Sequence, residues 1–218
     1  MSKTKKFLDS VHGFITVTDD YCKRFIDTEN FQRLRRIEQM SARSLFPSAH
    51  HDRFIHSIGV YHIGCKIAES ICRKKKINSS LIESYKIACL LHDCAHSPFS
   101  HTFEHLFGEK EELFKEYQEK VEQCDPAIKD VNIDDVDCKQ HEIISALLCV
   151  TLYSKKIKST KHKPSPELIG RMIMGCKYKT KEKSIEDCFI ELLHGFIDAD
   201  RMDYICRDRW GLVTCPHQ

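Results

Sequence analysis

Apolar residues recur at helical spacing over most of this chain, and strand-like alternation is rare. Apolar positions three and four apart form one face of an α-helix, whereas a period of two is typical of a half-buried strand. The pattern therefore predicts an all-α fold with minor β structure. Helices are expected at about 19–25, 28–37, 53–74, 80–94, 100–107, 141–152, 166–176, 184–195 and 198–209.

Short polar residues mark where two of these helices should begin. Asp19 or Asp20 is expected to cap the first helix and Thr28 the second, because such side chains accept hydrogen bonds from free N–H groups at a helix start. Pro98 should end the helix before it. Strand signals are sparse, and the candidate is the segment Phe14-Ile-Thr-Val17.

Two charged segments interrupt the helical pattern. Residues 109–139 carry mixed charge and then an acidic run, and residues 155–166 are basic and contain proline and serine. The second of these is predicted to be a loop. We expect one domain over residues 1–218, with 108–140 as a divergent charged insert.

Composition narrows the class of protein. The chain has 218 residues, 41% of them hydrophobic, which is enough to bury a core. A formal net charge of +2 does not point to nucleic acid or to a membrane surface. No apolar run approaches the roughly 18 residues of a spanning helix, and Asp9 interrupts any signal-peptide pattern. We expect an intracellular protein of the cytoplasm or nucleus.

The twelve cysteines invite a disulfide or zinc interpretation, but the chain has no Cys-x-x-Cys pair. We interpret them as reduced thiols that act as small core residues. The cysteines placed inside apolar helical stretches are Cys65, Cys72, Cys89, Cys149 and Cys206.

The most informative stretch is Leu90-Leu-His-Asp-Cys-Ala-His-Ser-Pro-Phe-Ser-His101. An apolar helix ends there in adjacent His92 and Asp93, followed by two more histidines. Neighbouring helical residues point about 100° apart, so a tight site needs ligands from elsewhere. Imidazoles and carboxylates together suit divalent first-row metals, and Mg²⁺ if oxygen ligands join. The alternative is a set of surface or hydrogen-bonded core histidines.

Several motifs together resemble the deoxynucleoside triphosphate (dNTP) triphosphohydrolase branch of the HD superfamily. They are Val11-His-Gly13, Ile26-Asp-Thr28, Phe31-Gln-Arg-Leu-Arg35, Arg53-Phe-Ile-His-Ser57, the His92–His101 stretch and Asp198-Ala-Asp-Arg-Met-Asp-Tyr204. The similarity runs from about residue 5 to 212, outside the insert. The resemblance implies an HD-domain helical fold, and the family's C-terminal lobe is expected to be absent from this chain.

The resemblance implies one divalent metal ion, either Fe, Mn, Zn or Mg. Its ligands would be His56, His92, Asp93 and Asp200. The alternative for Asp200 is a helix-start charge that the helix dipole favours.

The resemblance also implies a set of catalytic residues beside the metal: His96, His101, His141 and Glu104. Glu104 stands where the family has an aspartate, which puts its orienting role in doubt. His101 or His141 would donate a proton to the leaving oxygen, a task that suits the pKa of imidazole.

Five residues are predicted by the same resemblance to bind substrate: Gln39, Arg53, Arg201, Tyr204 and Asp208. The arginines would neutralise the triphosphate, for which their fork-like donors are suited. Arg201 replaces a lysine of the family. The alternative for Tyr204 and Asp208 is core packing and a surface ion pair.

Four N-terminal residues match an allosteric nucleotide site that reads a guanine activator such as GTP: Lys5, Asp27, Gln32 and Arg35. The alternative is ordinary helix capping and solvated charge. We also expect a tendency to self-associate, because the last helix, ending near Trp210, should expose an apolar face.

The expected function is a dNTP triphosphohydrolase that releases deoxynucleoside and inorganic triphosphate. One alternative is an HD nucleotidase or phosphodiesterase acting on other nucleotides. Another is a catalytically weak module that binds a nucleotide or nucleic acid, for which the lysine-rich segments offer little support because they lack interleaved aromatics.

Overall fold

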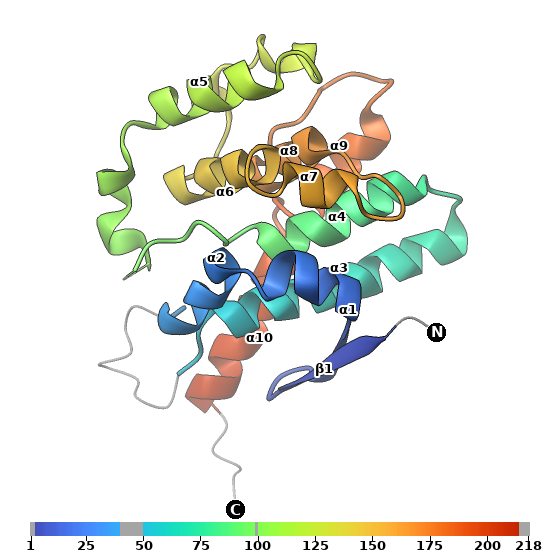
Figure 1. Ribbon diagram of the computed structural model, residues 1–218, viewed down its shortest axis with the longest axis vertical. Coiled ribbons are helices and arrows are strands. Elements are labelled where there is room, and N and C mark those ends of the chain that lie inside the picture. Colours follow the sequence, from blue (N-terminus) through green and yellow to red (C-terminus); the bar gives the residue numbers. More distant parts are fainter. Residues whose placement is uncertain (1–2, 40–49, 99, 214–218) are drawn as a thin grey trace, which may run out of the picture.

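Two neighbouring helices, α3 (Arg53–Lys74) and α4 (Ser79–Leu91), form the centre of the computed structural model, which describes residues 3–39, 50–98 and 100–213 (Figure 1). Asp52 caps α3 by accepting from the Ile55 N–H group, and Asn78 caps α4. The bounds of α3 agree with the sequence prediction. Helix α4 ends three residues before the predicted Cys94, and turns continue the chain.

The N-terminal part is a hairpin followed by short helices. Strands β1 (Thr4–Asp9) and β2 (Gly13–Thr18) pair antiparallel, with Thr4 opposite Thr18. The predicted strand lies in β2. Short helices follow in the order α1 (Asp19–Tyr21), π-helix η1 (Cys22–Ile26), α2 (Glu29–Gln32) and 3-10 helix η2 (Arg33–Arg36).

The helix starts in this part differ in one respect from expectation. Thr28 caps α2 as predicted. The cap of α1 is Thr18, however, and Asp19 and Asp20 stand in the first turn, where the helix dipole favours negative charge. The prediction of an aspartate cap was wrong because the threonine one residue earlier has the extended backbone that a cap requires.

The second half of the chain packs against α4 and crosses α3. Helices α6 (Gln140–Val150) and α8 (Pro166–Met174) lie together, and α8 contacts α4. Helix α10 (Ala199–Val213) crosses α3 (Figure 1). Two shorter helices are α7 (Ser154–Lys158) and α9 (Ser184–Glu191). The predicted loop is present at residues 159–165, but residues 155–158 belong to α7, where Ile157 is buried and anchors a helical turn among the lysines.

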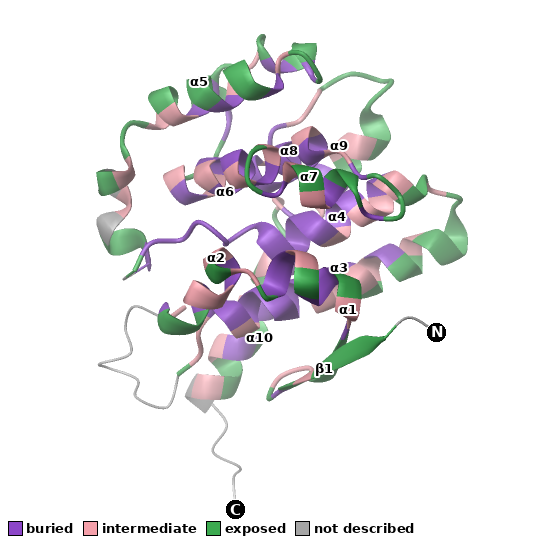
Figure 2. Cartoon of the chain, viewed as in Figure 1, coloured by how far each residue is buried: buried purple, intermediate pink, exposed green. Residues whose placement is uncertain are grey.

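The charged insert shares a second, smaller apolar core with α6 and α8. It contains α5 (Lys110–Val121) and the 3-10 helices η4 (Pro126–Ile128) and η5 (Ile133–Asp135). Its apolar residues pack with residues of α6 and α8. Helix α5 forms an outer layer whose buried side faces α6, while its other side is exposed (Figure 2). The charged side chains of the insert therefore lie on the outer surface of a packed layer.

The architecture is all-α with a small two-stranded sheet, as predicted. Cys89 and Cys149 are buried as expected, but Cys72 and Cys206 are exposed because their helices turn those positions to solvent. The cysteines of the described residues are all free thiols. No helix within the described part of the chain is long and apolar enough to cross a membrane.

A buried ion pair ties the insert to the core. Arg171 of α8 is completely buried and donates to Asp125, which precedes η4. We expect Asp125→Asn to lower the free energy of unfolding by about 3–5 kcal/mol, because the guanidinium charge would stay buried without its carboxylate. Urea unfolding measures this loss.

The matched control is Glu116→Gln on α5, which removes one partner of an exposed pair with Lys120. This control should cost less than about 1 kcal/mol. Equal, small losses for both variants would contradict the assigned role of Asp125.

Candidate active site

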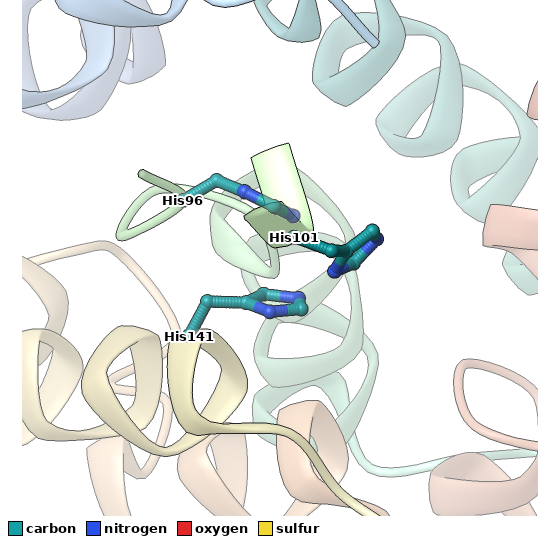
Figure 3. A group of neighbouring side chains, drawn as sticks. All are labelled: His96, His101 and His141. Carbon is teal, nitrogen blue, oxygen red and sulfur yellow. The ribbon is translucent and has the colours of Figure 1, made fainter. Parts of the chain in front are cut away.

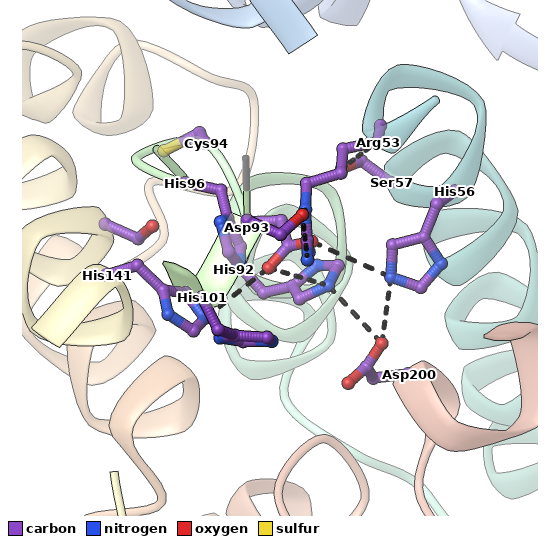
Figure 4. Close-up of polar contacts among 12 residues, drawn as sticks. Arg53, His56, Ser57, His92, Asp93, Cys94, His96, His101, His141 and Asp200 are labelled. Atoms are coloured by element: carbon purple, nitrogen blue, oxygen red, sulfur yellow. Dashed lines mark hydrogen bonds and ion pairs between the residues drawn. The ribbon is translucent and has the colours of Figure 1, made fainter. Parts of the chain in front are cut away.

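Three helices bring the predicted metal ligands together. His56 lies in the first turn of α3, His92 and Asp93 directly follow α4, and Asp200 lies at the start of α10 (Figure 4). His56 Nε2 is 2.9 Å from Asp200 Oδ1, and His92 Nε2 is 3.6 Å from the same oxygen. One ligand atom from each of these three residues lies within 4.8 Å of the others.

Asp93 completes the group from the opposite side. Its two oxygens lie 3.8 Å from His56 Nε2 and from His92 Nε2 respectively. Helix α4 ends at Leu91 and His92 still has helical dihedral angles, while turns continue over residues 92–95. His92 and Asp93 lie close to the same point although they are neighbours in sequence. Arg53 donates to Asp93, so this ligand is also an ion-pair partner.

The buried ligand atoms suit a metal ion. Among the described residues, His56 Nε2, His92 Nε2 and Asp200 Oδ1 have no partner in hydrogen-bond geometry, although they are buried. Buried polar atoms are nearly always paired, so this convergence calls for a ligand. The other ring nitrogens are held: His92 Nδ1 donates to the Cys89 carbonyl, and His56 Nδ1 donates to Asp203. Two imidazole nitrogens and carboxylate oxygens fit a divalent first-row ion.

The electrostatics of the group favour positive charge at its centre. Burial opposes protonation of His56, but Asp200 and Asp203 outweigh it and raise the pKa of His56 to about 10. Burial also opposes ionisation of Asp200, yet His56 and His92 hold its pKa below the usual range. The carboxylates that here stabilise a protonated imidazole would also stabilise a divalent cation.

A second cluster consists of three histidines beside the first. His96 follows α4, His101 lies in 3-10 helix η3 (Ser100–Phe107), and His141 lies in the first turn of α6 (Figure 3). The ring centroids of His96 and His141 are 4.1 Å apart and stacked, and those of His96 and His101 are 4.8 Å apart. His141 Nε2 is 3.7 Å from Asp93 Oδ1, so Asp93 lies between the two clusters.

Glu104 links two of these histidines. Its Oε2 is 3.0 Å from His101 Nδ1, and its Oε1 contacts His141 Nδ1. Burial alone would raise the pKa of Glu104, but His141 and then His101 lower it to about 2. The longer glutamate side chain thus reaches both rings, and a carboxylate in this position orients each ring with Nε2 free.

The three histidines form a second candidate ligand group as well as a candidate set for proton transfer. One nitrogen from each ring lies within 4.8 Å of the others. Among the described residues, both ring nitrogens of His96 are buried without a partner in hydrogen-bond geometry. Burial lowers the pKa of His96 to about 2 and, partly offset by Glu104, also lowers that of His101.

The predicted substrate residues differ in how far they face the site. Arg53 is only 3% exposed and binds Asp93 and Ser100 Oγ. The Arg201 side chain is 48% exposed and lies 3.7 Å from Asp198. Arg201 and Tyr204 line a cleft of about 890 Å³ that also reaches His92 and Asp200. Phosphate binding by these residues stays a prediction.

The other two predicted substrate residues, Gln39 and Asp208, both lie next to His51, which the sequence analysis missed. Its Nε2 is 3.3 Å from Asp208 Oδ1, and its carbonyl accepts from the Gln39 N–H group. Burial lowers the pKa of His51 to about 4, so the ring is neutral at pH 7. No motif quoted above includes His51. Its place beside Gln39 and Asp208 is visible only in the folded chain.

The four residues of the predicted nucleotide site lie near one another as two pairs. Lys5 Nζ is 2.7 Å from Asp27, and Arg35 donates to Gln32 Oε1 at 2.9 Å. The Arg35 guanidinium also lies over the Phe54 ring. These groups satisfy each other, so binding of a guanine nucleotide stays a prediction. Self-association likewise stays a prediction, although Trp210 is 50% exposed on α10.

The chain is similar to several known proteins. The HD-domain family model matches residues 53–131. The chain is 32% identical, over 99% of its length, to the deoxynucleoside triphosphate triphosphohydrolase SAMHD1 homolog of Dictyostelium discoideum, of which it covers 39%. It is 31% identical, over 96% of its length, to the uncharacterized protein YwfO of Bacillus subtilis, of which it covers 41%. The chain thus spans about two fifths of the length of these curated relatives.

A solved structure extends the similarity to the fold. The crystal structure of a hypothetical protein from Aquifex aeolicus matches 99% of this chain and 48% of its own, with a TM-score of 0.66 and 31% identity. The helical arrangement around the site is therefore the HD-domain fold.

The metal assignment leads to a direct test. We expect the purified protein to carry about one equivalent of a divalent metal per chain, and the double variant His92→Ala, Asp93→Ala to lose it, because two of the four ligand residues are gone. Elemental analysis of the dialysed protein measures the content. His162→Ala, a half-exposed histidine outside the site, is the control and should keep the metal. Full occupancy in the double variant would refute the assignment.

Proposed function

This chain carries an HD domain, and from that premise we propose that it is a metal-dependent phosphohydrolase that splits dNTPs into deoxynucleoside and inorganic triphosphate. The observation that carries the proposal is the position of Asp93 between two clusters. On one side are the candidate ligands His56, His92 and Asp200, and on the other are three histidines joined by Glu104. Such a pair of clusters can activate a phosphate and supply a proton next to it.

The reaction would be the attack of water on the α-phosphorus, with cleavage of its bond to the 5′-oxygen of the nucleoside. A bound divalent ion supplies Lewis acidity toward the phosphate and lowers the pKa of water. His101 or His141 would donate the proton that the leaving 5′-oxygen needs. Glu104 would hold these rings through Nδ1, so that Nε2 faces the substrate.

Binding of the substrate would use the cleft beside the ligands. Arg201 and Tyr204 line this cleft together with His92 and Asp200, so a phosphate chain entering it passes the candidate metal centre. Arg201 has an exposed guanidinium, which suits a highly charged group. Arg53 would act mainly by holding Asp93, because its guanidinium is already bound there. The relative from Dictyostelium discoideum supports the choice of substrate by its name.

The products test the proposed reaction. Incubation with each dNTP and Mg²⁺ or Mn²⁺, with and without GTP, should release the deoxynucleoside and intact triphosphate. Separation of the products by anion-exchange chromatography distinguishes this outcome from a nucleotidase reaction. Release of the monophosphate and pyrophosphate would place the cleavage on another bond and would refute the proposal.

The role of Glu104 predicts a pH effect. Glu104 raises the pKa of His101 against the effect of burial, so Glu104→Gln should lower that pKa further. Activity that needs a protonated histidine is lost as pH rises through its pKa, so the variant should lose activity at lower pH than the wild type. We also expect kcat to fall by about 10²–10⁴-fold.

The pH profile of kcat measures both effects. Glu112→Gln, an exposed carboxylate of α5, removes the same charge away from the site and should keep the wild-type profile. An unchanged alkaline limb for Glu104→Gln would show that this carboxylate does not act through His101.

A further inference from the structure

A buried chain of charged hydrogen bonds leads from His56 to the N-terminal hairpin. It begins at Asp203 of α10, which is completely buried and accepts from His56 Nδ1 through Oδ2 at 2.8 Å. The same carboxylate accepts from Arg207 at 2.8 and 2.9 Å, and from His12 Nε2 at 2.6 Å. Asp203 thus contacts one candidate ligand, an arginine and a second histidine, and none of the functions assigned above uses it.

The hairpin holds the far end of this chain. Arg207 donates to Asp9 Oδ2 at 2.8 Å, and Asp9 is only 3% exposed at the end of β1. Asp9 Oδ1 accepts from the N–H groups of Val11 and His12, which form the turn before β2. The turn therefore fixes the position of Asp9. Asp9 in turn fixes the guanidinium of Arg207, which donates to Asp203.

Close packing against α3 makes this arrangement specific. A Cβ atom added at Gly59 would lie 2.0 Å from Asp203 Oδ1 and 2.6 Å from an Arg207 nitrogen. Gly59 lies one turn after His56 on the same helix. Because Gly59 has no side chain, Asp203 and Arg207 can pack against α3 close to His56.

We propose that Asp203 is the positioning residue of the candidate metal ligand His56, and that Asp9 and His12 of the hairpin hold Asp203 in place. The proposal rests on the metal centre of the proposed function. A carboxylate that accepts from Nδ1 fixes the tautomer and the ring orientation, so that the Nε2 lone pair faces the ion. Metal affinity then depends on how the N-terminal hairpin docks, although the hairpin supplies no ligand.

The first test is Asp203→Asn, which keeps the size of the side chain and removes its charge. We expect the affinity for Zn²⁺ or Mn²⁺ to fall by about 10–100-fold, as for other partners of metal-bound histidines. Competition with a chromophoric chelator measures the dissociation constant. In the Zn²⁺-loaded protein, NMR should detect the His56 Nδ1 proton as a slowly exchanging, strongly hydrogen-bonded signal, which the variant shifts or loses.

The second test leaves every group that touches His56 unchanged. In Asp9→Asn, the amide oxygen can still accept the two turn N–H groups, while the amide nitrogen faces Arg207 and cannot accept from it. We expect a smaller loss of affinity in the same direction. Asp20→Asn is the matched control, because Asp20 pairs with Arg24 on the exposed side of the same N-terminal region. It should bind metal as the wild type does.

The outcomes separate this proposal from the proposed function. Wild-type affinity in folded Asp203→Asn or in Asp9→Asn would overturn the positioning role and leave the metal centre standing. If Asp203→Asn does not fold, as thermal unfolding of the metal-free protein would reveal, the Asp9→Asn result decides. A wild-type protein that binds no metal at His56 would overturn both proposals together.

Discussion

Carboxylates buried among cationic side chains are the constraint on which this site depends. Asp93 follows α4, and Asp200 and Asp203 belong to α10, where Asp200 is partly exposed and Asp203 is buried. Burial alone would raise the pKa values of all three. Each stays ionised because hydrogen-bond donors contact it: Arg53 for Asp93, the imidazoles for Asp200, and His12, His56 and Arg207 for Asp203. Removing Arg53 would leave the buried charge of Asp93 without its arginine partner, which costs free energy in a medium of low polarity.

This constraint explains why the site lies at helix ends. The first turn of α3, the end of α4 and the first turn of α10 each bring one or two polar residues to a common point. The middles of α3 and α4 pack an apolar core that extends from β2 to the first residue of α10. The middle of α10 instead buries Asp203 and Arg207. Turns follow α4 after Leu91, and His92 and Asp93 both lie close to the same point from adjacent positions.

Two peripheral segments, the N-terminal hairpin and the charged insert, are connected to the site by different kinds of contact. The hairpin acts through Asp9 and Arg207, a route made of charge-assisted hydrogen bonds. The insert acts through packing: its apolar residues contact α6, whose first turn carries His141. The backbone carbonyl of Asp137, at the end of the insert, accepts from His194 Nε2, and both residues line the cleft. Both segments are therefore joined mechanically to the candidate active site, although neither supplies a metal ligand.

The sequence by itself determined the helical class, the bounds of α3, the cap at Thr28 and the strand in β2, because each depends on local periodicity or on one capping side chain. The motifs also named the residues that gather at the site: His56, His92, Asp93 and Asp200 converge in the structure.

Only the tertiary structure decided which groups those residues contact. Arg53 pairs with Asp93, Asp203 holds His56, and His51 lies between Gln39 and Asp208 through contacts between segments distant in sequence. Helix α7 forms in a segment that looks like a basic loop because the core receives Ile157. Cys72 and Cys206 are exposed because packing determines which face of a helix is covered. Local patterns specify helices and turns, whereas the partners of a buried charge depend on which helices meet.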